Sequence, residues 1–411
     1  MREPVAVLGV DGGALSARAG AFLAGATLVV GGTRHLSTVN GIPASAELLP
    51  LGNVESALTR IRAHPGRTVV LASGDPGFFG ILRAIRRAAL PCVVEPAISS
   101  VALAFARLGL PWDDAVVVSA HGTTGERALR RAVNACRAHS TVAVLTGPGA
   151  GPDELAAALP GRRLVVASRL GHPDERVGEY PDAADWPAPT VVLALPPRLD
   201  NTARAGAAFY ERVPIVSEAG WLAGAPAAPD RWALPESAFE HRDSMITKAE
   251  IRALVLARLG PRTGDLVWDV GAGSGSVAVE CARFGAAAVA VDRDADAYSP
   301  IVHNAAVYGV EVDVVIDTAP ACLERLPDPD AVFVGGGGLD VLAACAARRP
   351  ARLVAAFAAV ERVGPALAAM TAAGYAAEGT QLQANRLSPL PDGTHRLAAV
   401  NPVTVLWGVL S

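Results

Sequence analysis

A short glycine loop near the middle of the chain carries the most specific chemical signal. The stretch LVWDVGAGSGSVAVE at 266–280 places Gly271, Gly273 and Gly275 between an apolar run and a helix-like run. Glycine lets a backbone turn sharply and approach a ligand that any Cβ would push away. Asp292 ends the next apolar run, about 20 residues further on, where acidic side chains of open α/β sheets bind ribose hydroxyls. This order predicts a binding site for S-adenosylmethionine (SAM).

The spacing of the glycines distinguishes a methyl donor from a dinucleotide. The dinucleotide fingerprint is G-x-G-x-x-G, whereas Ser276 stands here in place of the last glycine. An NAD-dependent oxidoreductase is therefore disfavoured. The alternative is a purely structural role, an ordinary tight turn between a strand and a helix. The strand before the loop and Asp292 after it favour ligand binding instead.

Elements that could hold such loops alternate along most of the chain. Short Val, Leu and Ala runs followed by Gly, Pro or Asp predict strands whose carboxyl-end loops gather at one sheet edge. The predicted strands of the first half are 5–10, 27–30, 68–73, 115–119, 141–146, 163–168 and 190–195. Beyond the glycine loop we expect a helix over 294–308 and strands at 310–317, 330–338, 352–360, 375–383 and 397–410. The fold class is therefore α/β.

Size and composition indicate a protein of more than one domain. At 411 residues the chain exceeds what one core usually fills, and 51% hydrophobic residues supply large buried sheets. The net charge of −4 provides no basic stripe, and aromatic residues are only 5%, which disfavours a nucleic-acid substrate. Charged or proline residues interrupt each apolar run, so no membrane-spanning segment is expected.

The cysteines and histidines predict neither disulfides nor a metal site. Five cysteines are scattered without a C-x-x-C pair, and the eight histidines show no metal-binding spacing. The beginning of the chain has no basic and apolar export pattern. We therefore expect a cytoplasmic protein with no bound metal.

Three loop segments of the first half are more informative together than singly. They are LASGDPGFFGI at 71–81, ISSVALAFARLGLPWDDAVVVSAHG at 98–122 and LTGPGAGPDELAAAL at 145–159. Each could instead have a purely structural role: an Asp-Pro helix entry, a serine helix cap and a glycine-proline turn, respectively. In this order they resemble the tetrapyrrole methylase family, and within it the cobalamin-pathway branch that methylates C5 of the precorrin ring.

That resemblance implies a two-lobed α/β fold with SAM in a cleft between the lobes. The residues that it places in the cleft are Gly74, Asp75, Ser99, Ser100 and Gly147, the last in the loop to Gly151. The first loop, Gly9–Ser16, departs from the family's fuller glycine-proline sequence, and Ala97 replaces a frequent glycine. These departures leave open whether the N-terminal site is fully active.

The second half resembles a different cobalamin-pathway family. ITKAEIRAL at 246–254, VFVGGGG at 332–338 and the closing NPVTVLW resemble the class I, Rossmann-like enzymes that methylate C15 and remove the acetate carboxyl at C12. The resemblance implies that SAM's methionine end contacts Thr247 and the loop Gly271, Ala272, Gly273, Ser274 and Gly275. It also implies Asp292 at the ribose, Thr318 and Ala319 at the adenine, and Gly335–Gly338 beneath the macrocycle.

The proline-rich, strand-poor stretch between the halves marks a boundary. We predict domains at 1–197 and 241–411, joined by a linker over 198–240, part of which packs on a domain through Trp221, Trp232 and Phe239. Together the halves resemble fused cobalamin-biosynthesis methyltransferases that methylate precorrin-6Y at C5 and C15 and release CO2, giving precorrin-8. This implies one SAM per domain, a tetrapyrrole partner and self-association into a homo-oligomer.

Two alternatives stay open from the sequence. A cobalt-bearing precorrin is as compatible with these motifs as a metal-free one. A non-catalytic tetrapyrrole carrier, or an enzyme with one degenerate SAM site, is compatible with the altered first loop. Several arginines, Arg18, Arg34, Arg107, Arg169 and Arg293, are candidates for binding the anionic side chains of the ring. The sequence identifies no catalytic side chain.

Overall fold

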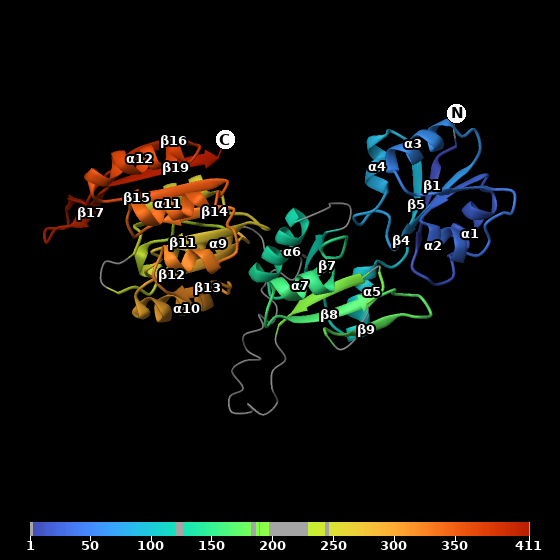
Figure 1. The fold of residues 1–411 in the computed structure, drawn as a ribbon, viewed down its shortest axis with the longest axis horizontal. Helices are drawn as coiled ribbons and strands as arrows, with labels where there is room; N and C mark the ends of the chain where they lie inside the picture. The colour runs from blue at the N-terminus through green and yellow to red at the C-terminus, as the bar shows by residue number, and fades with distance from the viewer. Residues whose placement is uncertain are drawn as a thin grey trace, which may run out of the picture. The chain divides into compact units, whose positions relative to one another are not determined.

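The computed structural model describes residues 3–120, 126–181, 186–188, 190–196, 229–242 and 246–410 (Figure 1). The chain divides into two compact units. One comprises Met1–Glu126 with Ala143–Ala223, and the other Arg127–Val142 with Gly224–Ser411. Residues 127–142, which the sequence assigned to the first domain, are thus grouped with the second unit. Of the expected linker, 198–228, with Trp221, lies outside the described residues.

The first unit contains two five-stranded sheets, the first of them parallel. The strand order of this parallel sheet is β3-β2-β4-β1-β5. The strands are β1 (Val5–Val10), β2 (Leu28–Gly31), β3 (Glu47–Pro50), β4 (Thr68–Ser73) and β5 (Cys92–Glu95); the helices are α1 (Ala17–Ala24), α2 (Thr33–Thr38), α3 (Val54–Ala63) and α4 (Leu82–Arg87). Apolar side chains of α3 and α4 pack on one face of the sheet and those of α1 on the other. Both faces are therefore buried, as the uninterrupted Val and Leu runs predict.

The second sheet has the order β6-β7-β10-β8-β9, and β8 is antiparallel to both of its neighbours. Its strands are β6 (Val116–Ser119), β7 (Val142–Leu145), β8 (Arg163–Ser168), β9 (Arg176–Glu179) and β10 (Thr190–Leu195); nearby in sequence are α5 (Ser100–Leu108), α6 (Glu126–Ala138) and α7 (Pro152–Ala158). Helix α5 packs on it through Val101, Ala104 and Phe105. The expected strands are present, whereas the short strands β3, β5 and β9 were not predicted.

The second unit is built on a seven-stranded sheet of order β13-β12-β11-β14-β15-β19-β16. Its strands are β11 (Leu266–Val270), β12 (Ala287–Asp292), β13 (Asp313–Ile316), β14 (Ala331–Val334), β15 (Arg352–Phe357), β16 (Tyr375–Leu382) and β19 (Val403–Leu410). The first five are parallel, and β19 enters antiparallel between β15 and β16. This confirms the α/β fold class predicted for the second half and the Rossmann-like architecture that its resemblance implies.

Helices cover both faces of this sheet and complete a three-layer unit. They are α8 (Ala249–Leu259), α9 (Ser276–Arg283) and α10 (Tyr298–Val307) on one face, and α11 (Leu339–Ala347) and α12 (Val363–Ala372) on the other. Short 3-10 turns lie at η1 (Glu236–Ala238), η2 (Ala295–Ala297), η3 (Ala321–Arg325) and η4 (Val360–Arg362). The described part of the expected linker, 229–240, belongs to this unit: Phe239 is buried in it, and Trp232 contacts Phe284.

The strands predicted at 310–317 and 352–360 are shorter in the structure, at Asp313–Ile316 and Arg352–Phe357, and two other predicted boundaries differ by more. The expected strand 397–410 is divided into β18 (His395–Ala399), which pairs with β17 (Asn385–Pro389), and β19. Pro402 lies in the break, where its missing N–H cannot join a ladder. The strand expected to reach 338 ends at Val334, because the following glycines form a loop in which Gly337 has φ +99°.

Candidate functional site

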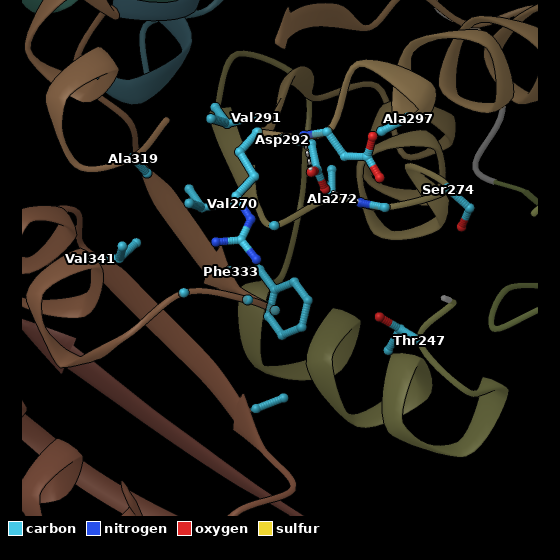
Figure 2. Close-up of a pocket in the computed structure, with 18 of the residues that line it drawn as sticks. Thr247, Val270, Ala272, Ser274, Val291, Asp292, Ala297, Ala319, Phe333 and Val341 are labelled. Atoms are coloured by element: carbon cyan, nitrogen blue, oxygen red, sulfur yellow. Dashed lines mark hydrogen bonds between the residues drawn. The ribbon is translucent and has the colours of Figure 1, made fainter. Parts of the chain in front are cut away.

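A cavity of about 830 Å³ lies at the carboxyl ends of the parallel strands of the second unit (Figure 2). The strand order reverses around β11, with β12 on one side and β14 on the other, and open α/β sheets bind ligands at such a point. The predicted residues that line the cavity are Thr247, Gly271, Ala272, Gly273, Ser274, Asp292, Thr318, Ala319 and Gly335–Gly338. Gly275 instead precedes α9 with φ +70° and faces Ile301 of α10.

The glycine loop touches the loop after β14 along its backbone. The Gly271 N–H donates to the Val291 carbonyl at 2.8 Å, and Gly271 has φ +79°. A Cβ on Gly271 would lie 2.5 Å from the Gly336 backbone nitrogen. Two features therefore require glycine at this position: the positive φ and the close approach of another backbone.

Asp292 holds the glycine loop as well as facing the cavity. Its Oδ2 accepts a hydrogen bond from the Gly273 N–H at 2.8 Å, and its Oδ1 accepts one from the Asp294 N–H at 3.0 Å. Each carboxylate oxygen retains a free acceptor site, since an ionised carboxylate accepts about four hydrogen bonds. The carboxylate can thus fix the loop and receive two ligand hydroxyls.

The Ser274 hydroxyl oxygen is buried and has no hydrogen-bond partner among the described residues. The residue as a whole is 2% exposed. Leaving a buried hydroxyl unpaired costs about 1–3 kcal/mol, so a ligand that pairs with it gains that amount. Together with the backbone cradle of Gly271 and Gly336, this atom suits the amino-acid end of SAM.

Charged side chains around the cavity differ in how far they are neutralised. Arg242 forms ion pairs with Asp294 and Asp296. Arg362 donates from Nη1 to the Gly337 carbonyl at 3.2 Å, in the Gly335–Gly338 loop that the resemblance places beneath the macrocycle. Arg293, a candidate from the sequence, also lines the cavity. These arginines thus line the cavity together with several aspartates, which neutralise part of their charge.

The apolar wall of the cavity was not predicted from the sequence. Figure 2 shows Val270, Phe333 and Val341 around the same space as Asp292 and Thr247, and Val403 lines it too. Val403 starts β19, and an antiparallel strand begins at the edge where its parallel neighbours end. The sequence could have indicated Val403 only through a prediction that β19 is antiparallel and of its register with β15.

Asp269 is a fully buried carboxyl beneath the glycine loop. Its side chain is 1% exposed and accepts a hydrogen bond from the Ala278 N–H at 3.0 Å. Burial, together with the charge of Asp292, raises the pKa of Asp269 from its usual 3.8 to about 7. The carboxyl therefore keeps its proton in the folded state at pH values where the unfolded chain has lost it.

This raised pKa predicts a pH-dependent stability. Between the unfolded and folded pKa the native state binds more protons, so the free energy of unfolding falls as pH rises and becomes level above about pH 7. Relative to Asp269→Asn, the wild type is expected to lose about 3 kcal/mol between pH 5 and pH 8. Denaturant unfolding of both proteins across this range measures it; stability curves that stay parallel would contradict the prediction.

In the first unit, four of the five predicted cleft residues lie together. Gly74, with φ +58°, packs against the backbone of Ser99 and Ser100, since an added Cβ would lie 3.0 Å from the Ser99 Cα. Asp75 follows directly and accepts from the Gly77 N–H at 2.8 Å. Gly147 lies beyond β7 in the other sheet, bridged to Ala150.

The first loop of this unit is shaped by close backbone contacts. A Cβ on Gly9 would collide with the Gly74 carbonyl and the Ala97 N–H, and Gly12, with φ +90°, packs against Gly171 beyond β8. The Gly13 N–H is bound by the Asp11 side chain at 3.0 Å. The shortened loop therefore has a defined conformation, and Gly9 brings it to the Gly74 turn.

Ser99 has a structural role that can be measured. Its Oγ accepts from the Ala102 N–H at 3.1 Å and so caps α5, as the purely structural alternative proposed. Ser99→Ala is expected to lower the free energy of unfolding of the first unit by about 1 kcal/mol. Ser99→Asn, which retains a cap acceptor, should recover most of it. Equal stability of the alanine variant and the wild type in denaturant titration would be inconsistent with this role.

Two further findings bear on the expectations from the sequence. Among the described residues, no group of three or more His, Cys, Asp or Glu side chains is arranged to hold a metal ion. No helix in the described ranges is long and apolar enough to cross a membrane.

The fold and this cavity define a class of proteins. The second unit has a sheet between two layers of helices, a glycine loop, an aspartate at a strand end and a pocket where the strand order reverses. This is the architecture of SAM-dependent methyltransferases. The family of tetrapyrrole (corrin/porphyrin) methylases matches residues 8–184, and the precorrin methyltransferase domain matches residues 237–410. The chain belongs to the precorrin-6Y C(5,15)-methyltransferase (decarboxylating) family.

The membership rests on the first of the following relatives, and the others are similar proteins. The precorrin-6Y C(5,15)-methyltransferase (decarboxylating) of a Sinorhizobium species is 36% identical over 347 residues, which is 80% of this chain and 77% of the relative. The protein of that name from Mycobacterium tuberculosis is 38% identical over 280 residues, 65% of this chain and 63% of the relative. A solved C-terminal domain of the Rhodobacter capsulatus enzyme is 37% identical, covering 43% of this chain and 97% of that domain, with a TM-score of 0.39.

Proposed function

We propose that the chain methylates precorrin-6Y at C5 and C15 with SAM and removes the carboxyl of the C12 acetate, giving precorrin-8 in cobalamin biosynthesis. The single observation that supports this most is the match of both halves, in order, to a curated relative of that activity over 80% of the chain. The cavity of the second unit supplies the geometry for one of the two donor sites.

In this proposal the C-terminal cavity binds SAM along the glycine loop. Asp292 accepts the ribose hydroxyls, Thr318 and Ala319 face the adenine, and Thr247 with the Ser274 hydroxyl contact the methionine end. The donor supplies an electrophilic methyl group. We assign the second SAM to the N-terminal unit, at Gly74, Asp75, Ser99, Ser100 and Gly147, so that each domain holds one.

The protein's contribution to methyl transfer is positioning and the exclusion of water. A reduced tetrapyrrole carbon is already electron-rich, so no base is needed to generate the nucleophile, and holding the reactants in line supplies several kcal/mol. Val270, Phe333 and Val341 form the apolar wall that keeps water away. On decarboxylation the C–C bond to the carboxylate breaks and CO2 leaves, while the electron pair passes into the conjugated macrocycle, which acts as its own electron sink. A proton from solvent then converts the remaining CH2 carbon to a methyl group.

The decisive experiment is mass spectrometry of the product formed from precorrin-6Y and SAM. Gain of two methyl groups with loss of CO2 supports the proposal. Gain of one methyl, with or without CO2 loss, would assign a degenerate site to one half, and an unchanged substrate would overturn the proposed activity. Repeating the reaction with the cobalt-bearing precorrin distinguishes the two substrate forms.

Location and assembly belong to the same proposal. None of the five cysteines forms a disulfide, which suits the reducing cytoplasm where we place the reaction. We expect the chain to form a homo-oligomer, which light scattering of the purified protein would measure.

A further inference from the structure

We infer that residues 230–240, here called the strap, position the SAM site of the second unit through three buried polar side chains, Arg252, Glu280 and Asn304. None of the strap residues lines the cavity. The strap is instead bonded to side chains that also hold the cavity wall. This inference rests on the proposed role of the cavity as a SAM site.

Arg252 and Glu280 join the strap to the two helices that flank the cavity. Both side chains are 0% exposed, and Arg252 Nε donates to Glu280 Oε1 at 2.8 Å. The Glu280 carboxylate accepts from the strap at the Ala233 N–H, 2.6 Å, and the Leu234 N–H, 3.0 Å. Helix α8 carries Arg252 and helix α9 carries Glu280, so the pair fixes the strap to both.

The same guanidinium reaches the cavity wall. Its Nη1 donates to the Thr247 carbonyl, and also to the Ser276 Oγ at 3.4 Å, at the first residue of α9. Its Nη2 donates to the Leu234 carbonyl of the strap. Only the planar fork of an arginine can join these acceptors at once, since the donors of a lysine diverge from a single nitrogen.

Asn304 links the strap directly to the glycine loop. It is 1% exposed, and its Nδ2 donates to the Glu240 carbonyl and to the Ser274 carbonyl, each at 2.9 Å. Its Oδ1 accepts from the Glu240 N–H at 2.7 Å. Both amide hydrogens are therefore used, one on each segment. A shift of the strap at Glu240 must move the Ser274 carbonyl with it or break a buried hydrogen bond.

A role in positioning explains this network better than a role in stability. A fully buried ion pair contributes little net stability, because removing two charges from water costs about as much as their attraction returns. The network instead bonds the strap to Thr247 and Ser274, which lie on the same side of the cavity in Figure 2. The strap is thereby connected to the segments that we assign to the methionine end of SAM.

Hydrogen exchange of the wild-type protein tests the coupling without any substitution. Saturation with S-adenosylhomocysteine (SAH) is expected to slow exchange of the Ala233, Leu234 and Glu240 amides at least threefold, since coupling between sites is reciprocal. If SAH protects the glycine loop and leaves these strap amides unchanged, the inference is overturned while the proposed function stands. If SAH protects neither region, the proposed SAM site itself fails.

A matched pair of variants gives the second test. Asn304→Leu removes the bond to Ser274, whereas Tyr308→Phe removes only the bond from the Tyr308 hydroxyl to the Ala238 carbonyl of the strap. Calorimetric titration should show SAH binding weakened about tenfold by the first and less than twofold by the second. Equal SAH affinity in both variants, with only their melting temperatures lowered, would show a merely structural role. Arg252→Lys, which leaves Asn304 intact, should also weaken SAH binding, and an unchanged affinity would count against the strap.

Discussion

Replacing Asp292 by alanine is expected to weaken SAH binding at the C-terminal cavity by about 100-fold. In the proposed complex the carboxylate accepts two ribose hydroxyls, and each hydrogen bond to a charged group contributes about 1.5–3 kcal/mol. A loss of about 3 kcal/mol corresponds to about 100-fold in the dissociation constant. The N–H groups of Gly273 and Asp294 also lose their acceptor, so the loop itself is less well held.

Calorimetric titration of the full chain with SAH measures this effect. Any site in the N-terminal unit serves as an internal reference, because its affinity should not change. Asp328→Ala is the matched control, since Asp328 is an exposed partner of Arg348 and does not line the cavity. The product formed by Asp292→Ala should carry one new methyl and retain its carboxyl. An affinity for SAH within threefold of the wild type would remove Asp292 from the site.

Gly271→Ala is expected to disrupt both the stability of the second unit and its cavity. The new Cβ would lie 2.5 Å from the Gly336 nitrogen, so one of two backbones must move. Overpacking costs about 1–3 kcal/mol, and a positive φ on a residue with a Cβ adds about 1 kcal/mol or more. We expect the free energy of unfolding to fall by about 3 kcal/mol and SAH binding to weaken at least tenfold.

A control for the backbone conformation alone exists in the same unit. Gly309 has φ +61° and open space around the position of a Cβ, so Gly309→Ala carries the cost of the positive φ without a collision. It should lower stability by about 1 kcal/mol and leave SAH binding unchanged. If the two alanine variants lost the same stability in denaturant titration, the close contact of Gly271 with Gly336 would have no energetic weight.

The sequence determined the chemistry of the C-terminal site because that chemistry is local. The glycines at 271 and 273 and the acid at 292 lie at the ends of two apolar runs, and parallel strands bring their carboxyl ends to one edge. The order of strands and helices followed from the same periodic pattern. The predicted β11, β12, β14 and β15 therefore formed one sheet around the loop.

The tertiary structure alone decided which distant residues complete that site. Phe333 and Val341 flank the loop of glycines after β14, and Val403 reaches the cavity only because β19 runs antiparallel to β15. Gly275 lies within the predicted motif but faces Ile301, since the turn into α9 points it away from the cavity. No local pattern encodes such contacts, because they depend on strand register and helix packing.

The strap shows the same division most clearly. From the sequence, 198–240 was a connection with a few aromatic residues that pack, and no pattern linked it to Arg252 or Glu280. Folding removes both charges from water and leaves the strap amides as partners of the Glu280 carboxylate. Residue types and spacing thus fixed what the site can bind. The packing of segments far apart in the chain decided how its walls are held, because buried polar groups must find partners wherever the fold places them.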